Sequence, residues 1–360
     1  MERNQAALRL SEISSPAPCP MTAAVRGLAT TGAELQGVVD QGWLNLSWVA
    51  PDAKLEAATT VAGPWQTVIT TNSPYRLRVS NLANRCGFYR LQMPPPGRKW
   101  LTLAAVTMTS QTNTDANLQT FYSYMERAAS NHVDLIVFPE VALQGCPPWA
   151  EYARPPTQTE MAYVRDTAEF VPGPSTDKLV AKARDLGIYV AFGMTEKDAA
   201  GNIYNSAVFL GPTAVIGTHR KSIQVGNDGL IWSRGTQLIQ VFDSPLGRVG
   251  LMICAEMAGE SASVTTVPGP RLAAQGADFL VTVSAWWTSA ASNYDLATKE
   301  NARQANRWHV VANQVGRIGY AQTYGYSRVV DPRGRVVCDT GTKEGLVLWA
   351  TDNLIECGIQ

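Results

Sequence analysis

Three residues whose types could support covalent hydrolysis each follow an apolar run of the sequence. Cys254 comes directly after residues 249–253, Glu140 follows the run 133–138, and Lys221 follows a shorter run. A thiol attacks a carbonyl carbon once a base has taken its proton, and a cation stabilises the oxygen that becomes negative. Because ligands of open α/β sheets gather where strands end, these three side chains form one candidate catalytic set.

Each of these residues also has a simpler interpretation when it is taken alone. A cysteine is often a buried structural residue, a glutamate after a strand is often a solvated loop residue, and Lys221 beside Arg220 is typical of a surface charge pair. The usual base for a thiol is histidine, but His132, His219 and His309 show no recognisable spacing to a cysteine. A carboxylate is therefore the remaining candidate base.

Strands alternate with helices from residue 101 onwards, and this order predicts a layered α/β domain. The expected strands cover residues 101–106, 133–138, 188–194, 206–210, 248–253, 279–284 and 309–313. The expected helices lie around 118–125 and over 176–186, with Thr176 as the N-cap, and over 271–275 and 294–308. A hairpin with the turn Asp331-Pro-Arg-Gly334 closes the domain.

The first part of the chain, up to about residue 96, differs in amino-acid composition from the rest. It is rich in Thr, Ser, Pro and Gly, with short alternating runs such as 43–48 that are typical of strands. It resembles a small β-sandwich module of the kind appended to bacterial secreted enzymes, which could bind carbohydrate, bind protein or act as a spacer. We expect a flexible arm over residues 1–22, this module over 23–96 and the α/β domain over 97–360, with the proline-rich stretch 93–98 as a stiff linker.

Composition excludes several classes of function. Of 360 residues, 45% are hydrophobic and 17% charged, which is enough apolar material for a large core. The 30 basic residues balance 30 acidic ones, so no net field attracts nucleic acid or an anionic membrane. Neither a membrane-spanning run nor a signal-peptide pattern occurs, which favours a cytoplasmic location, although the module resembles those of exported proteins. Six scattered cysteines without a CxxC pair argue against a zinc site and a dense disulfide framework.

Four motifs in order resemble those of the nitrilase-like carbon–nitrogen hydrolase superfamily, over roughly residues 101–352. They are Phe138-Pro-Glu140; Gly201-Asn-Ile-Tyr-Asn-Ser206 followed by His219-Arg-Lys221; Gly250-Leu-Met-Ile-Cys254; and Glu300-Asn-Ala-Arg303 with Val310-Val-Ala-Asn313. Any one of them is weak, but four in this order make coincidence a poor explanation. The resemblance implies an α-β-β-α sandwich whose subunits pair through their helical layers into dimers or larger homo-oligomers.

The resemblance also implies roles for individual residues: Glu140 as general base, Lys221 as oxyanion stabiliser and Cys254 as nucleophile. The family uses a second glutamate four residues before an aromatic residue that begins a turn, and here Asp228 holds that position before Trp232. Aspartate keeps the charge but is shorter, so its reach to the lysine or to a substrate is open. A turn-forming role for Asp228 is the alternative.

The implied reaction is attack of the Cys254 thiolate on an amide, departure of ammonia or an amine, and hydrolysis of the thioester by water that Glu140 activates, without a metal or organic cofactor. The backbone N–H of Ala255 is the expected second oxyanion donor. Trp286 could shape the acyl pocket, although tryptophans after a strand are more often core or subunit-contact residues. Glu256 could tune the site or form a structural ion pair.

Four functions remain open, with hydrolysis of a small linear amide or carbamoyl compound in the lead. Nitrile hydrolysis through a thioimidate would use the same three residues, but nitrilases tend to carry Trp and Glu directly after the cysteine, and here Ala255 takes the Trp position. Acyl transfer to another amine is a third function. The fourth is a catalytically degenerate binding or scaffold protein, which the unusual Asp228 suggests.

The stretch Cys146-Pro-Pro-Trp149 is a further candidate for the pocket wall.

Overall fold

The computed structural model divides the chain into two compact units, Met1–Trp100 and Leu101–Gln360. In the first unit the structure describes only the strands. In the second it describes residues 101–145, 154–237, 239–259, 264, 266–318 and 321–351. The units divide close to the predicted linker, whose residues lie outside the described part, so the expected arm, module and domain bounds stay predictions.

Eight short strands are described in the first unit. They are β1 (Ala7–Arg9), β2 (Val25–Gly27), β3 (Leu35–Asp40), β4 (Trp43–Trp48), β5 (Lys54–Ala58), β6 (Gln66–Thr67), β7 (Tyr75–Arg78) and β8 (Phe88–Gln92). They form two antiparallel sheets with the orders β1-β8-β5-β6 and β2-β3-β4-β7. Strand β1 lies within the stretch for which the sequence predicts an arm, and β4 coincides with the predicted strand 43–48.

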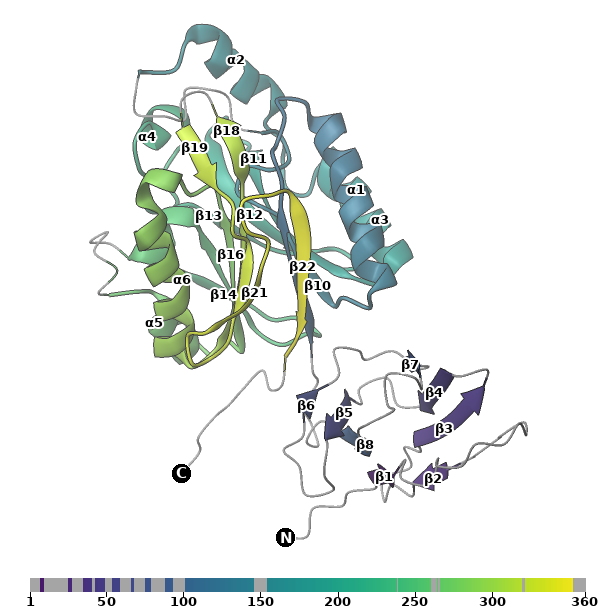
Figure 1. Ribbon diagram of the computed structural model, residues 1–360. Helices are drawn as coiled ribbons and strands as arrows, with labels where there is room; N and C mark the ends of the chain where they lie inside the picture. Colours follow the sequence, from purple (N-terminus) through teal and green to yellow (C-terminus); the bar gives the residue numbers. More distant parts are fainter. Residues whose placement is uncertain are drawn as a thin grey trace. The chain divides into compact units, whose positions relative to one another are not determined.

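Two six-stranded sheets form the centre of the second unit (Figure 1). The first sheet contains β9 (Thr102–Thr107), β10 (Leu135–Val137), β11 (Tyr189–Lys197), β12 (Ile203–Leu210), β13 (Val215–Arg220) and β22 (Gly345–Ala350), in the order β13-β12-β11-β10-β9-β22. The second contains β14 (Gln240–Phe242), β15 (Val249–Ile253), β16 (Phe279–Ser284), β17 (Trp308–Asn313), β20 (Arg328–Val330) and β21 (Val336–Asp339), in sequence order. Strands β9, β10 and β11 are parallel, as are β15, β16 and β17, and the outer pairings are antiparallel. The hairpin β18 (Val315–Ile318) and β19 (Ala321–Tyr324) lies outside both sheets.

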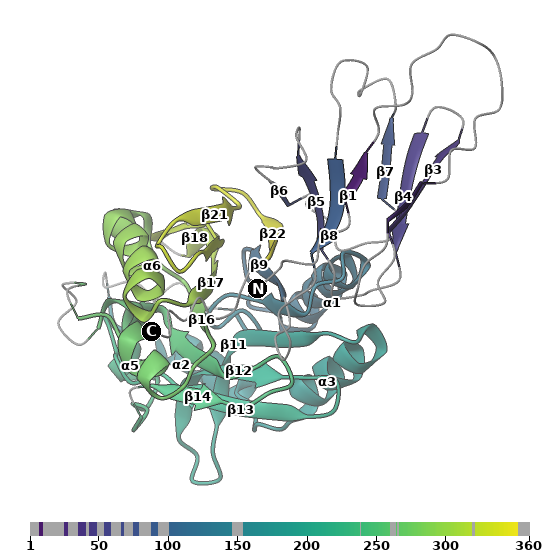
Figure 2. The ribbon, with the colours of Figure 1, turned by 90° about the horizontal axis from the view of Figure 1, so that it is seen from below.

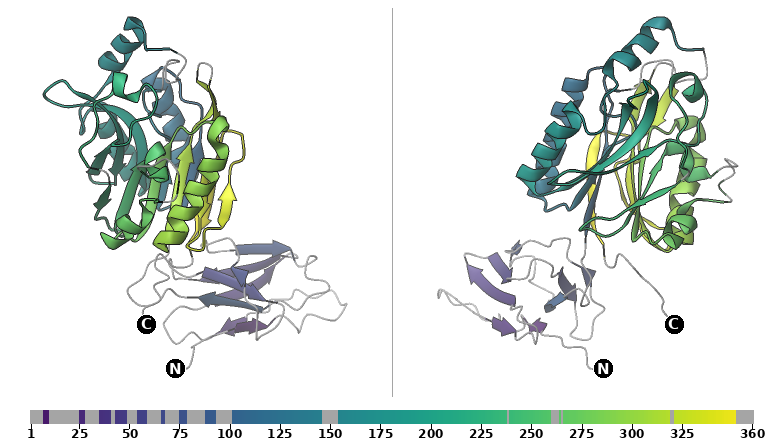
Figure 3. Two further views of the ribbon diagram at one scale, coloured as in Figure 1. Left: turned by 90° about the vertical axis from the view of Figure 1, so that its left-hand side faces the viewer. Right: turned by 180° about the vertical axis from the view of Figure 1, so that it is seen from behind.

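Helices cover the outer face of each sheet. The first sheet carries α1 (Thr114–Ser130) and α3 (Pro174–Leu186), and the second carries α5 (Gly269–Ala274) and α6 (Ala291–Ala305). Figures 2 and 3 show the two sheets between these helix pairs, which confirms the predicted α-β-β-α sandwich. The described part of the chain also contains the α-helices α2 (Gln158–Thr167) and α4 (Asp228–Ile231). None of the helices in the described part of the chain has the length and apolar character needed to span a bilayer.

Three apolar clusters fill the spaces between these four layers. Residues of a strand alternate between its two faces, and β9 shows how this serves two clusters at once. Ala104 and Val106 pack with Phe121 of α1, whereas Leu103 and Ala105 lie in the cluster between the two sheets. A third cluster fills the space between the second sheet and helices α5 and α6. Both sheets are therefore buried on both faces, which explains the nearly continuous apolar runs that precede the candidate residues.

The N-cap predicted for α3 is wrong by three residues. Gly173 holds the N-cap position and Pro174 is the first helical residue, which suits a ring whose φ is already helical and which lacks an N–H. The Thr176 hydroxyl accepts the backbone N–H of Gly173 at 2.7 Å, so it contributes to the cap from inside the helix. Elsewhere the predicted strand 279–284 coincides with β16.

Candidate active site

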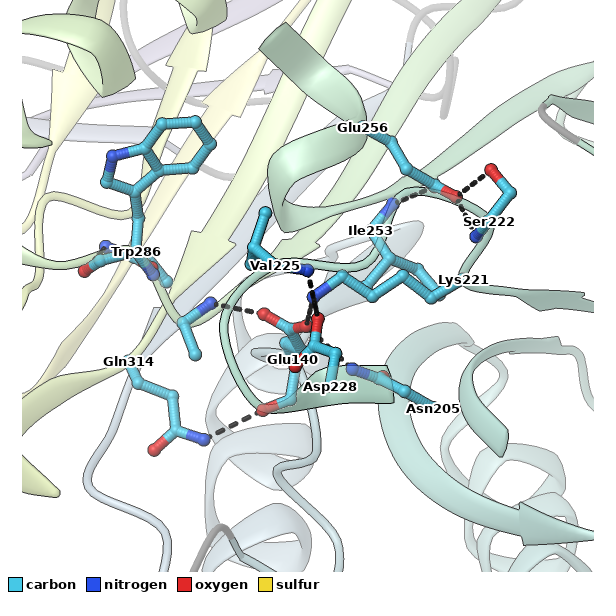
Figure 4. Close-up of polar contacts among 12 residues, drawn as sticks. Glu140, Asn205, Lys221, Ser222, Val225, Asp228, Ile253, Glu256, Trp286 and Gln314 are labelled. Atoms are coloured by element: carbon cyan, nitrogen blue, oxygen red, sulfur yellow. Dashed lines mark hydrogen bonds and ion pairs between the residues drawn. The ribbon is translucent and has the colours of Figure 1, made fainter. Parts of the chain in front are cut away.

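Strand ends from both sheets meet at the candidate active site. Glu140 follows β10 and Lys221 follows β13 in the first sheet, while Cys254 follows β15 in the second. The lysine Nζ lies 2.7 Å from Glu140 Oε1 (Figure 4). Both charged groups are close enough to the Cys254 thiol to shift its pKa. The structure therefore brings together all three residues that the sequence singled out.

The Glu140 carboxylate is buried and held by donors on both of its oxygens. It is 4% exposed. Oε1 accepts the side-chain amide of Asn205 at 2.8 Å, and Oε2 accepts the backbone N–H of Ala285 at 2.9 Å. Its own backbone is fixed as well, because its N–H donates to the carbonyl of Ser284 and its carbonyl accepts the side chain of Gln314 at 2.8 Å. Such a carboxylate has one orientation in which to exchange a proton.

Lys221 lies between two carboxylates. In addition to Glu140, its Nζ contacts Asp228 Oδ2 at 2.8 Å, and only 4% of the lysine side chain is exposed. Burial is the largest influence and lowers the pKa of Lys221, but the charges of Asp228, Glu140 and Cys254 together raise that pKa well above its usual value. The ammonium therefore stays charged. The backbone of Lys221 is fixed as well, because its N–H donates to the carbonyl of Asn205 at 2.8 Å.

Asp228 makes two contacts, one within its own turn and one to the lysine. It is the first residue of α4, and its Oδ2 accepts the backbone N–H of Val225 at 3.1 Å, a local bond typical of an aspartate in a turn. The same oxygen reaches Lys221. The shorter side chain thus spans the distance to the lysine, because α4 brings its backbone close.

Cys254 leaves its strand at a sharp turn. Its φ is 46°, a left-handed value that residues with a side chain rarely adopt, and the residue is 8% exposed. Burial and then the charge of Glu140 raise the pKa of the thiol to about 12, while Lys221, the backbone N–H of Ala285 and the Ser284 hydroxyl lower it. The resting thiol is therefore protonated at neutral pH, and a nearby base has to take its proton during attack.

Glu256, the second residue after the cysteine, forms an ion pair. Its Oε2 lies 2.8 Å from His219 Nε2, and both side chains are completely or almost completely buried. The carboxylate points towards Ser222 (Figure 4). The ion pair that the sequence suggested for Glu256 is therefore present, with His219 as its partner.

The sequence profile of the carbon–nitrogen hydrolase family matches residues 102–356, which is most of the second unit. The chain belongs to this family. A protein named nitrilase 2, from an unknown prokaryotic organism, is 29% identical over 240 residues, which cover 62% of this chain and 74% of that protein. The omega-amidase NIT2 of Mus musculus is 29% identical over 197 residues, covering 51% of this chain and 69% of that protein.

A solved structure shares the fold of this carbon–nitrogen hydrolase. It is a variant of the amidase from Nesterenkonia sp. AN1 that carries the acetamide moiety of fluoroacetamide, covalently added at its active-site cysteine. The TM-score is 0.59 at 19% sequence identity, over 72% of this chain and 93% of the amidase. Nitrilases and amidases are thus both among the relatives of this hydrolase.

Trp286 lies at the edge of the site in this carbon–nitrogen hydrolase and is half-buried. Its indole N–H donates to the carbonyl of Ala290 at 2.9 Å, its backbone N–H donates to Asn313 Oδ1 at 2.7 Å, and its ring centroid is 6.0 Å from that of Tyr294. These contacts fix the ring as part of the protein's packing, and its role as a pocket wall stays a prediction. The other predicted pocket stretch, 146–149, lies outside the described residues.

Sequence reasoning missed the residues that hold the carboxylate of this hydrolase. Asn205 lies inside the motif 201–206, but nothing in the sequence indicated that its side-chain amide would donate to Glu140. Ala285 directly follows the apolar strand β16, just as Cys254 follows β15, and that position was the available signal. In the described part of the chain, no three His, Cys, Asp or Glu side chains gather as metal ligands.

Proposed function

We propose that this protein hydrolyses the C–N bond of a small linear amide or carbamoyl compound through a thioester on Cys254. The observation that carries the proposal is the buried Glu140–Lys221 contact beside the thiol, with Asp228 as the second partner of the lysine. A lone buried cation or carboxylate would be costly, whereas this set supplies a base, a cation and a nucleophile together.

The reaction proceeds in two halves. Glu140 takes the proton of the Cys254 thiol as the sulfur attacks the carbonyl carbon, and Lys221 with the backbone N–H of Ala255 stabilises the resulting oxyanion. The protonated Glu140 then gives its proton to the leaving nitrogen, and ammonia or an amine departs as the thioester forms. A water molecule, deprotonated by Glu140, attacks the thioester, and the carboxylic acid leaves as the thiol regains its proton.

Nitrile hydrolysis is the second candidate. The relative named nitrilase 2 supports it, and the same residues could carry a nitrile through a thioimidate. Against it, Ala255 takes the position after the cysteine where nitrilases tend to carry tryptophan. We therefore place amides first.

The test is ammonia release from short aliphatic amides, carbamoyl amino acids and nitriles, with mass spectrometry of the intact protein to detect the acyl-enzyme. We expect turnover of amides, a mass increase equal to the acyl group, and loss of both in Cys254→Ala. Cys338→Ala is the matched control, because Cys338 is the other free cysteine in the described part of the chain. Preferred turnover of nitriles would make nitrile hydrolysis the function. No turnover and no alkylation of Cys254 would support a binding or scaffold role.

The protein should also form homo-oligomers through a helical layer. The family resemblance supports this proposal, and Leu296 of α6, a large apolar side chain that is 47% exposed, is the position at which we test it. Light scattering should report a dimer or larger assembly for the wild type and a smaller species for Leu296→Glu. A wild-type monomer would contradict the proposal.

A further inference from the structure

A second buried ionic cluster lies behind the nucleophile and contains none of the residues to which the reaction is assigned. Glu256 and His219 are 1% and 0% exposed and contact each other through Oε2 and Nε2. The other imidazole nitrogen, Nδ1, lies 3.0 Å from Gln240 Oε1. Burial is the largest influence and lowers the pKa of His219, but the charge of Glu256 and the hydrogen bonds to Glu256 and Gln240 together raise that pKa above its usual value. Because both ring nitrogens face oxygen acceptors, the imidazolium is the form that fits.

One oxygen of this cluster supports the turn at the nucleophile. Cys254 begins the 3-10 helix η3 (Cys254–Ala258) in its left-handed conformation. Such a conformation persists only where its surroundings enforce it. Glu256 is the third residue of η3, and its Oε2 accepts the backbone N–H of Ile253 at 2.7 Å. The carboxylate thus fixes the strand end from which the thiol turns.

The other oxygen fixes the segment that carries the lysine. Glu256 Oε1 accepts the backbone N–H of Ser222 at 2.7 Å and its hydroxyl at 2.8 Å (Figure 4). Ser222 directly follows Lys221, which comes from the first sheet, whereas η3 continues from β15 of the second sheet. One carboxylate therefore connects the two sheets at the point where each delivers a reacting group.

We propose that Glu256 is a positioning residue that holds the Cys254 thiol in place relative to the Lys221 ammonium, with His219 as its counter-ion. The inference rests on the proposed function for the roles of the thiol and the ammonium. Glu256 acts through the backbone of its neighbours, and its four accepted hydrogen bonds require the ionised carboxylate.

Glu256→Gln tests geometry separately from charge. The ionised pair of Glu256 and His219 carries no net charge, and a glutamine that faces a neutral imidazole carries none either. An amide keeps the shape but turns one acceptor into a donor, which opposes the N–H of Ser222 if it replaces Oε1 or that of Ile253 if it replaces Oε2. A change in Cys254 reactivity then reports misplacement.

Asp331→Asn is the matched control for the loss of a buried, turn-supporting carboxylate. Asp331 is 3% exposed and accepts the backbone N–H and the guanidinium of Arg335 in the β20–β21 turn. This turn lies at the start of β17, because Val330, just before the turn, pairs with His309 near the beginning of that strand. The site lies at the other end of β17, where Asn313 accepts the backbone N–H of Trp286. The control therefore weakens the fold at the opposite end of the sheet.

The experiment measures three quantities for the wild type, Glu256→Gln, Ser222→Ala and Asp331→Asn: kcat and KM for the best amide, the rate of Cys254 alkylation by iodoacetamide, and the Tm. We expect Glu256→Gln to lower kcat and the alkylation rate by about ten- to a hundredfold with little change in KM, since small misplacements of reacting groups have effects of this size. Ser222→Ala should lower both less, because the backbone N–H still bonds Glu256. Asp331→Asn should lower only the Tm.

The outcomes separate this inference from the proposed function. If kcat and the alkylation rate of Glu256→Gln match those of Asp331→Asn while both variants lose stability, Glu256 has a structural role only. If Glu256→Gln does not fold, an unchanged alkylation rate in Ser222→Ala overturns the proposal. If the wild type hydrolyses no amide but the alkylation rates still fall in both variants, the proposed function fails and the positioning role stands.

Discussion

Replacing Lys221 by methionine should make the stability of the protein depend on pH in a predictable direction. The ammonium bridges Glu140 Oε1 at 2.7 Å and Asp228 Oδ2 at 2.8 Å, and its side chain is 4% exposed. Methionine has a similar length and flexibility but no charge. The variant therefore leaves two carboxylates facing each other across an apolar gap, with no cation between them.

The size of the effect follows from the spacing of the two carboxylates. Two negative charges about 5 Å apart repel each other by about 3 kcal/mol at an effective dielectric constant of about 20. This energy corresponds to about two pH units in the binding of one proton to the pair. As the pH rises, the folded variant should then keep one proton between the two carboxylates after the unfolded chain has released it. Because the native state binds more protons, the stability of the variant falls as the pH rises.

The assay is denaturant-induced unfolding of the wild type, Lys221→Met and Lys182→Met at pH 5 and at pH 8. Relative to the wild type, Lys221→Met should lose about 2 kcal/mol more at pH 8 than at pH 5. Lys182 is the control because its partner Glu126 is 57% exposed, so its replacement should cost less than about 1 kcal/mol at either pH. Equal losses for Lys221→Met at both pH values would show that the lysine does not separate two ionised carboxylates.

Three further predictions concern the same site. Ser284→Ala should raise the pKa of the Cys254 thiol further, because the hydroxyl lowers it, and the pH profile of iodoacetamide alkylation should move to higher pH; an unmoved profile would mean that the hydroxyl does not act on the sulfur. His219 should stabilise the fold fully below about pH 6.5, with the contribution lost as the pH rises through its raised folded pKa, so the stability difference between the wild type and His219→Gln should shrink at alkaline pH. A constant difference would contradict an ionised pair. Asn205→Leu should lower kcat about tenfold or more by releasing Glu140, measured as ammonia release at saturating substrate, and an unchanged kcat would show that the amide is dispensable.

Local sequence predicted a layered α/β domain and pointed to strand ends as the place of the candidate site. Buried strands with apolar side chains on both faces read as continuous runs, and the first polar residue after such a run marks a strand end. Glu140, Lys221 and Cys254 were singled out on this basis, together with the motifs that surround them. Strand β16 was predicted to the residue because its six positions are all buried. Strand β14 was not predicted, since three partly buried residues give too short a pattern.

The contacts that organise the site were decided by the tertiary structure. Lys221 and Glu140 are 81 positions apart in the chain, and Ser222 and Glu256 are 34 apart. The periodicity of the sequence does not reveal such pairs, because it reflects only the burial of each strand. The partners follow different strands, which lie in one sheet for Glu140 and Lys221 and in different sheets for Ser222 and Glu256. The sequence determined which residues end strands, since burial sets the local pattern. Whether Asp228 reaches the lysine depended on where α4 places its backbone. Which partners Glu256 binds depended on how the two sheets pack face to face, which no single segment encodes.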